Sequence, residues 1–234
     1  MERLDELAAR YALPPRSSAR LARLLDLVAA EPASITTVRD PRRGADVHVA
    51  DSLVALDLSI VRGAARLADL GAGAGFPGLA LAVALPATEV VLVESVQRKA
   101  AFMRSAASAL ALANVSVAAV RAESWAPGLG ACDIVTARAL APLGVLLEYA
   151  APLLRLGGAL VAWKAVPSGD ELRNAAAAAA ILGMGEPVAH AVSPYPEAGE
   201  RSLYVSSKVM DTPAGYPRRE GMARKRPVGR SGRA

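Results

Sequence analysis

The chain has 234 residues, of which 53% are apolar and 4% aromatic, and a net charge of +5. This length fits one α/β domain with a small extension, and so few aromatic residues argue against a nucleic-acid surface built from stacked rings. A single cysteine, Cys132, excludes a disulfide framework and a multi-cysteine metal site, so no metal is expected. Neither a targeting signal nor a membrane-spanning stretch is visible, and we expect a soluble, cytoplasmic protein without membrane contact.

The first 60 residues predict a small helical extension. Apolar residues recur at helical spacing from Leu4 to Ala30, with an interruption at Pro14-Pro15. Two short helices are therefore expected, the second capped by Ser17 or Ser18. A turn-rich link then leads to a further helix from Asp46 to Leu58.

Between residues 61 and 210, short apolar runs alternate with helical stretches. The expected strands are 65–70, 89–94, 115–120, 133–137 and 159–164, and the expected helices are 78–85, 96–112, 142–154 and 168–183. This alternation predicts an α/β fold with a mostly parallel sheet covered by helices on both faces. Two further runs, 187–192 and 202–208, flank a loop with proline and glycine and predict an antiparallel hairpin at the sheet edge.

The positive charge is concentrated at the C-terminus. Residues 211–234 carry seven arginines and lysines against two acidic residues, so this segment has a net charge of +5 and residues 1–210 sum to zero. The composition predicts a flexible basic tail that contacts a polyanion, with nucleic acid the commonest such partner. The alternative is a solvated terminus that only keeps the protein soluble.

A glycine-rich loop follows the first expected strand, with the sequence Asp69-Leu70-Gly71-Ala72-Gly73-Ala74-Gly75-Phe76-Pro77-Gly78. Glycines allow a tight turn and close approach of a ligand. Glu94 ends the next strand, where a carboxylate accepts the hydroxyls of a ribose; the alternative is an interaction with the following helix dipole. Gly-x-Gly-x-Gly after an aspartate is typical of S-adenosylmethionine sites, whereas a pyrophosphate cofactor favours Gly-x-Gly-x-x-Gly.

Further candidates lie at later strand ends and in the helical extension. Ala122-Glu123 follows the third strand, where an adenine pocket is expected; its alternative is an exposed loop carboxylate. Arg138 and Lys164 end the fourth and fifth strands, where open α/β sheets bind ligands, and we expect Arg138 in the site and Lys164 on a phosphate. For Arg138 the alternative is a salt bridge to a neighbouring acid.

His48, Asp51 and Ser52 fall on one face of an expected helix. This polar cluster either faces the cleft, in contact with cofactor or RNA, or forms a network that locks the helical layer to the sheet.

Several segments resemble the 16S rRNA guanine-N7 methyltransferases, also called the glucose-inhibited division protein B family. The most specific are His48-x-x-Asp51-Ser52-Leu53 and Gly75-Phe76-Pro77-Gly78; the others are 34–41, 69–74, 93–95, 121–123, 137–139, 163–164 and 216–221. The resemblance covers nearly the whole chain after residue 10. It departs where Lys164 is followed by alanine instead of glycine, and where Ser34-Ile35-Thr36 replaces an Asn-Leu-Thr-like stretch.

The resemblance implies a Rossmann-like class I methyltransferase core at 61–210, an N-terminal helical extension at 1–60 and a basic tail at 211–234. With the residue patterns above, it predicts that S-adenosylmethionine is held by Asp69, Gly71, Gly73, Gly75, Phe76, Glu94, Ala122, Glu123 and Arg138. RNA contacts are expected from His48, Lys164, Arg201, Arg218, Arg219, Arg224, Lys225 and Arg226. The expected partner is 16S rRNA in the small ribosomal subunit or its assembly intermediates, and the protein is expected to be a monomer.

The implied reaction needs few catalytic groups. Guanine N7 carries an exposed lone pair and can attack a sulfonium methyl directly, so no general base is required, and Arg138 and Lys164 are candidates only for positioning. The alternatives are a methyltransferase for another RNA, a protein or a small molecule, a nicotinamide-dependent oxidoreductase, and a non-catalytic RNA-binding assembly factor. The sequence shows no Tyr-Lys or His-Asp catalytic arrangement for the oxidoreductase, and the intact glycine loop disfavours the assembly factor.

Overall fold

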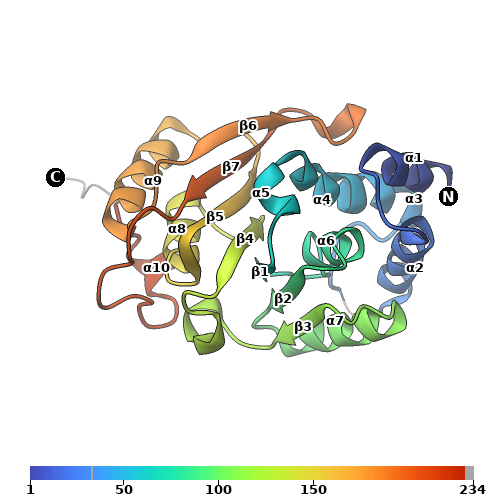
Figure 1. Ribbon diagram of the computed structural model, residues 1–234, viewed down its shortest axis with the longest axis horizontal. Coiled ribbons are helices and arrows are strands. Elements are labelled where there is room, and N and C mark those ends of the chain that lie inside the picture. Colours follow the sequence, from blue (N-terminus) through green and yellow to red (C-terminus); the bar gives the residue numbers. More distant parts are fainter. Residues whose placement is uncertain (33, 230–234) are drawn as a thin grey trace.

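The computed structural model describes residues 1–32 and 34–229. Their strands form one seven-stranded sheet in the order β3-β2-β1-β4-β5-β7-β6 (Figure 1). The bounds are Arg66–Leu70 (β1), Glu89–Val93 (β2), Val115–Ala118 (β3), Cys132–Arg138 (β4), Leu154–Lys164 (β5), Val188–Val192 (β6) and Arg201–Ser207 (β7). β1 to β5 are parallel, and β7 pairs antiparallel with both β5 and β6. The predicted parallel sheet with an antiparallel edge hairpin is therefore confirmed.

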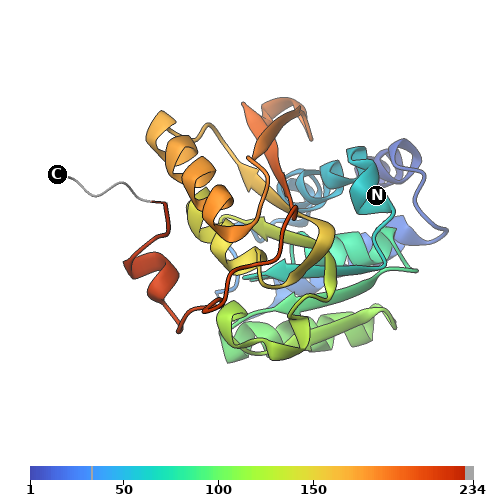
Figure 2. The same ribbon diagram turned by 60° about the vertical axis from the view of Figure 1, so that its left-hand side comes forward.

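Helices cover both faces of the sheet. Successive residues of a strand point to opposite faces, and in the central strands the residues on both faces are apolar. In β2, Val90 and Leu92 belong to the apolar cluster on one face, and Val91 and Val93 to the cluster on the other. The first face is covered by α6 (Gly78–Ala84) and α7 (Gln97–Ala109), and the second by α8 (Leu143–Ala150) and α9 (Gly169–Leu182), as Figures 1 and 2 show.

β5 begins at Leu154, five residues earlier than expected, and α8 correspondingly ends at Ala150. The pairing of β4 with β5 shifts register between Cys132 and Ile134, so the early part of β5 pairs separately from the rest. The sequence predicts only the later part of this strand, because Gly157-Gly158 interrupts its apolar pattern.

The first 62 residues form a helical layer with α1 (Glu2–Arg10), α2 (Ser17–Ala30), α3 (Pro41–Gly44), α4 (Asp51–Leu53) and α5 (Ser59–Arg62). The expected serine cap of α2 is wrong: the cap position is Arg16, and the Ser18 hydroxyl donates to the Leu4 carbonyl, 3.4 Å away. Ser17 is the first residue of α2 and is buried, and its hydroxyl makes no capping hydrogen bond.

The helix expected from Asp46 to Leu58 is a composite. Helical turns run from Pro41 to Asp57, and Ala45–Ala50 adopt the wider π-helical hydrogen bonding. Such π segments are frequently found at functional sites, and this one contains His48. The Ser52 hydroxyl donates to the His48 carbonyl one turn back.

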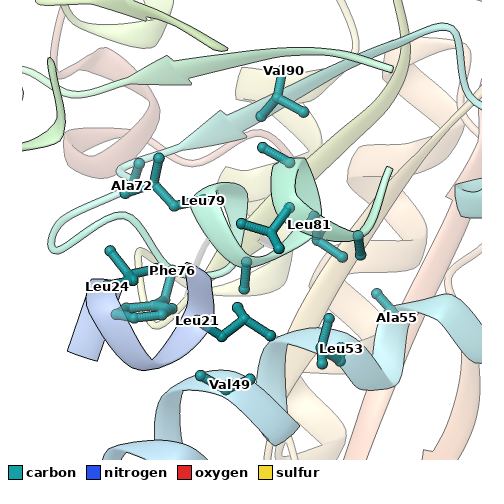
Figure 3. Packing of buried hydrophobic residues seen from close by; sticks show 14 of the residues in the cluster. Leu21, Leu24, Val49, Leu53, Ala55, Ala72, Phe76, Leu79, Leu81 and Val90 are labelled. Atoms are coloured by element: carbon teal, nitrogen blue, oxygen red, sulfur yellow. The ribbon is translucent and has the colours of Figure 1, made fainter. Parts of the chain in front are cut away.

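The helical layer shares its core with the sheet domain. Leu21 and Leu24 of α2, together with Val49 and Leu53, pack against α6 and Phe76 in one apolar cluster (Figure 3). Because this layer buries its apolar side against α6, it fixes the position of the loop that immediately precedes α6.

α9 begins with half of the expected capping box. The Ser168 hydroxyl accepts from the Glu171 N–H at 3.2 Å, but the Glu171 carboxylate turns away and accepts from the Leu143 N–H at 2.9 Å. The same carboxylate forms an ion pair with Lys164. Glu171 therefore connects the start of α9 to the start of α8 and to the end of β5.

The C-terminal segment differs from the flexible tail that the composition predicts. After β7 the chain returns to α8 and forms a short helix, α10 (Met222–Lys225), beside it (Figure 2). Ala223 is buried in the apolar cluster of α8 and α9, which explains why the basic segment is held against the protein. Arg230 and Arg233 lie outside the described residues. No helix of the described ranges is long and apolar enough to span a membrane.

We expect Leu53→Ala to lower the free energy of unfolding by about 2–5 kcal/mol, because the side chain is fully buried between α6 and the helical layer and its loss leaves a cavity. Val166→Ala, at a site that is 72% exposed, is the control, with an expected change within about 0.5 kcal/mol. Urea unfolding of both variants measures the difference; equal stabilities would show that the layer is not part of the core.

Candidate functional site

The glycine-rich loop lies at the carboxyl ends of the parallel strands. Gly71, Gly73 and Gly75 have φ of +64°, +60° and +90°, a region that favours glycine. A Cβ on Gly71 would lie 2.6 Å from Leu140, and one on Gly75 would lie 2.3 Å from Leu79. At Gly73 the nearest atom to such a Cβ is 3.7 Å away, so the middle of the loop is open on that side. The loop is thus closely packed at both ends and open in its middle.

Asp69 supports the loop from beneath. Its two carboxylate oxygens accept from the Gly78 N–H and the Thr136 hydroxyl, both at 2.9 Å, and its exposed surface is 0%. The prediction that Asp69 contacts the cofactor is therefore wrong, because a fully buried side chain offers no surface to a ligand; it positions the start of α6. Burial raises the pKa of Asp69 to about 6.

Glu94 joins the loop to the start of α7. One carboxylate oxygen accepts from the Gly73 N–H at 3.0 Å and the other from the Val96 N–H at 2.8 Å, and only 6% of the residue is exposed. A carboxylate has about four acceptor positions, so each oxygen can accept a further hydrogen bond. The arrangement suits the predicted ribose contact, which stays a prediction.

A pocket of about 230 Å³ opens beside Glu94, between the carboxyl ends of β1 to β4. It is lined by Gly71, Val93, Ser95, Val120, Arg121, Ala122, Glu123, Leu140, Tyr149 and Arg224. The volume is smaller than the roughly 300–1,000 Å³ of most small-molecule sites, and it suits one end of an elongated ligand. Gly71, Ala122 and Glu123 were expected here. Tyr149 was missed, because no motif marks it, and Arg224 was expected to contact RNA instead of lining this pocket.

The predicted polar cluster lies around Asp51, on the Phe76 side of the loop. Asp51 is buried, and one of its oxygens accepts from Arg138 Nη1 at 2.8 Å. The other lies 3.5 Å from Arg201 Nε, and the Asp51 carbonyl accepts from the Trp163 indole N–H at 2.6 Å. Together with His48 and Phe76 we call these residues the Asp51 cluster; they connect the helical layer to the ends of β4, β5 and β7.

His48 is an interior member of the Asp51 cluster. Its ring stacks on Phe76 with the ring centroids 4.7 Å apart, and its Nε2 lies 2.9 Å from the Val38 carbonyl. Burial lowers the pKa of His48, so the ring is neutral at pH 7. A buried neutral ring does not favour the expected RNA contact. Of the three polar residues, Asp51 joins the helical layer to the sheet through Arg138, whereas Ser52 donates to His48 within the layer.

The strand-end cations are paired. Lys164 Nζ lies 2.6 Å from a Glu171 oxygen and donates to the Ala141 carbonyl at 3.4 Å, so a phosphate would compete with Glu171 for this ammonium. Arg138 is bonded to Asp51 and lies over the Phe76 ring at 5.9 Å. This was the alternative for Arg138, and it still leaves the guanidinium beside the glycine loop.

The described cations of the basic tail differ in their partners. Arg218 forms two 2.6 Å hydrogen bonds with Glu148, so a phosphate would compete with this carboxylate for the guanidinium, and the expected RNA contact stays a prediction. Arg219, Arg224, Lys225 and Arg226 are exposed, and their RNA contacts stay predictions. Arg224 also lines the pocket beside Glu94.

The pattern of the rRNA small subunit methyltransferase G family matches residues 19–195. The chain belongs to this family. It is 41% identical over 202 residues to ribosomal RNA small subunit methyltransferase G of Rubrobacter xylanophilus, covering 84% of this chain and 77% of the relative.

Solved structures agree with the fold. A predicted O-methyltransferase from Agrobacterium tumefaciens superposes with a TM-score of 0.51 at 26% identity, over 68% of this chain and 79% of its own. An S-adenosylmethionine-dependent O-methyltransferase from Thermotoga maritima gives a TM-score of 0.51 at 16% identity, over 78% of this chain and 73% of its own. The predicted Rossmann-like methyltransferase fold is confirmed, and family and fold together indicate S-adenosylmethionine as the cofactor.

Asp69 generates a pH dependence of stability. Between pH about 4 and about 6 the folded protein retains a proton that the unfolded chain loses, so the free energy of unfolding falls by up to about 3 kcal/mol as the pH rises through this window. Asp69→Asn removes this dependence and keeps both contacts, since the Thr136 hydroxyl can accept from the amide. Urea unfolding of both proteins from pH 4 to 7 tests this; a constant difference between them would contradict it.

Proposed function

We propose that the protein transfers a methyl group from S-adenosylmethionine to N7 of a specific guanine in 16S rRNA. Membership of the rRNA small subunit methyltransferase G family is the observation that carries the choice of substrate. The open glycine loop beside Glu94 supports the choice of cofactor. The closest alternative is a methyltransferase of the same fold that acts on another RNA or on a small molecule.

The residues present fit the cofactor. The Gly71–Gly75 loop would receive its amino-acid end, Glu94 would accept the ribose hydroxyls, and the pocket at Ala122 and Glu123 would hold the adenine. Phe76 and Arg138 would lie near the amino-acid end. When bound, the cofactor supplies a methyl group on a positively charged sulfur.

The site suits a nucleophile that needs no base. Guanine N7 loses no proton before it attacks, so the protein has only to place N7 in line with the methyl group. The reaction moves a positive charge from the cofactor to the base, and unpaired cations nearby would oppose binding of the charged cofactor. Arg138 and Lys164 are paired with Asp51 and Glu171, so they can orient groups here without adding net charge.

RNA would approach the carboxyl edge of the sheet. The target guanine would have to be unpaired or extruded, because N7 must reach the methyl group at close range. Arg201, which is half-buried, and the exposed Arg219, Lys225 and Arg226 would contact phosphates with little sequence preference. We propose that the protein acts in the cytoplasm and as a monomer. Its substrate would be 16S rRNA, either free or in an assembling small subunit.

Methyl transfer tests the substrate. Labelled S-adenosylmethionine is incubated with the protein and either purified small-subunit particles or naked 16S rRNA, and the modified base is mapped. One N7-methylguanine is expected, on whichever of the two substrates presents the base. Transfer to neither, by a protein that binds the cofactor, would overturn the rRNA assignment and leave the alternative substrates.

We expect Glu94→Ala to raise the Kd of S-adenosylhomocysteine at least tenfold, or about 1.4 kcal/mol, because the variant loses both the ribose acceptor and the hydrogen bond that holds Gly73. The matched control is Glu89→Ala, at the opposite end of β2, where the side chain is exposed. Isothermal titration calorimetry provides both values, and an unchanged Kd for Glu94→Ala would remove Glu94 from the cofactor site.

A further inference from the structure

The C-terminal segment Tyr216–Arg226, which we call the strap, is fastened to the loop that follows β3. Glu123 accepts from the Gly221 N–H at 2.9 Å. In return, Glu220 of the strap accepts from the Ser124 hydroxyl at 2.6 Å and pairs with Arg121 at 3.2 Å. These contacts involve the same loop, 121–124, that forms one side of the pocket beside Glu94.

A second attachment joins the strap to α8. Arg218 donates twice to Glu148, whose side chain is only 3% exposed, and this hydrogen bonding raises the pKa of the Arg218 guanidinium. Ala223 of α10 is buried against the same apolar cluster as α8. Because the strap is attached to the β3 side and to α8, it bridges the two sides of the pocket; Figure 1 shows α10 beside α8.

Arg224 brings the strap into the pocket itself. Its Nη2 donates to the Leu140 carbonyl at 2.9 Å, and its guanidinium lies beside the Tyr149 hydroxyl. Arg224, Leu140 and Tyr149 all line the pocket. The Leu140 side chain also fills the space next to Gly71, so Arg224 is connected through one residue to the glycine loop.

We propose that the strap is the outer wall of the site for the adenosine end of S-adenosylmethionine, and that Arg224 is a cofactor-binding residue. This inference rests on the proposed function of the site. The proposed ribose acceptor Glu94 directly follows β2, and the pocket continues from there to Ser95 and Ala122, so the part of the ligand beyond the ribose meets the strap. A guanidinium can stack on a purine or donate to its ring nitrogens.

Calorimetric titrations of the full-length protein with two probes test the proposal. S-adenosylhomocysteine carries both ends of the cofactor, and 5′-methylthioadenosine carries only the adenosine end. Arg224→Ala is expected to raise the Kd of both probes by about tenfold and by the same factor, the effect of losing one charge-assisted hydrogen bond. Arg224→Lys keeps the charge without the planar fork, so it should restore only part of the affinity. Arg173→Ala, an exposed arginine on α9, controls for the loss of a positive charge.

A second variant loosens the strap without changing the pocket lining. Glu220→Ala removes the contacts with Arg121 and Ser124, and because the Glu220 side chain is 51% exposed, the melting temperature is expected to stay near that of the wild type. A rise of several-fold in both Kd values is expected.

Each other outcome overturns the proposal. Unchanged affinities in Arg224→Ala and Glu220→Ala, in a wild-type chain that binds both probes, would show that the strap is only structural. A loss confined to S-adenosylhomocysteine would place Arg224 at the amino-acid end, and an equal loss in Arg173→Ala would show a general charge effect. A wild-type chain that binds neither probe would overturn the proposed cofactor, and the strap assignment with it.

Discussion

The site depends on two buried carboxylates that hold one glycine-rich loop. A loop that leaves its backbone open to a ligand cannot be stabilised by its own side chains, so its shape must come from neighbours. Asp69 fixes the end of the loop by accepting from Gly78, and Glu94 fixes its middle by accepting from Gly73. The cost of burying Asp69 appears in its raised pKa, and the gain is a loop whose geometry does not depend on the ligand.

Two peripheral parts of the chain then enclose this loop from opposite sides. The helical layer reaches it through the Asp51 cluster, where His48 stacks on Phe76 and Arg138 bonds to Asp51. The strap reaches it from the side of the pocket, through Arg224 and Leu140. Both parts lie outside the strand–helix alternation of the core, so the extensions at the two ends of the chain shape the site.

The paired cations have a functional consequence. Arg138, Lys164 and Arg218 each lie beside a carboxylate, so the carboxyl edge of the sheet carries less net positive charge than a count of its cations suggests. A positively charged cofactor is tolerated better in such a setting, and in the proposed function the attraction of RNA phosphates would come from exposed residues such as Arg219 and Lys225.

The sequence by itself determined the order of strands and helices, the edge hairpin and the position of the glycine loop, because each depends on local periodicity and on residues that permit unusual backbone angles. The position of Glu94 beside the glycine loop was predictable for the same reason, since the end of one parallel strand lies next to the end of its neighbour. Only the tertiary structure decided which charged or polar side chains are buried or paired and which remain exposed. Asp69 and His48 are buried by elements far away in the chain, and Arg218 is neutralised by Glu148, 70 residues earlier. The sequence shows how many charged residues there are but not which of them form ion pairs, because pairing depends on which surfaces come into contact when the layers pack.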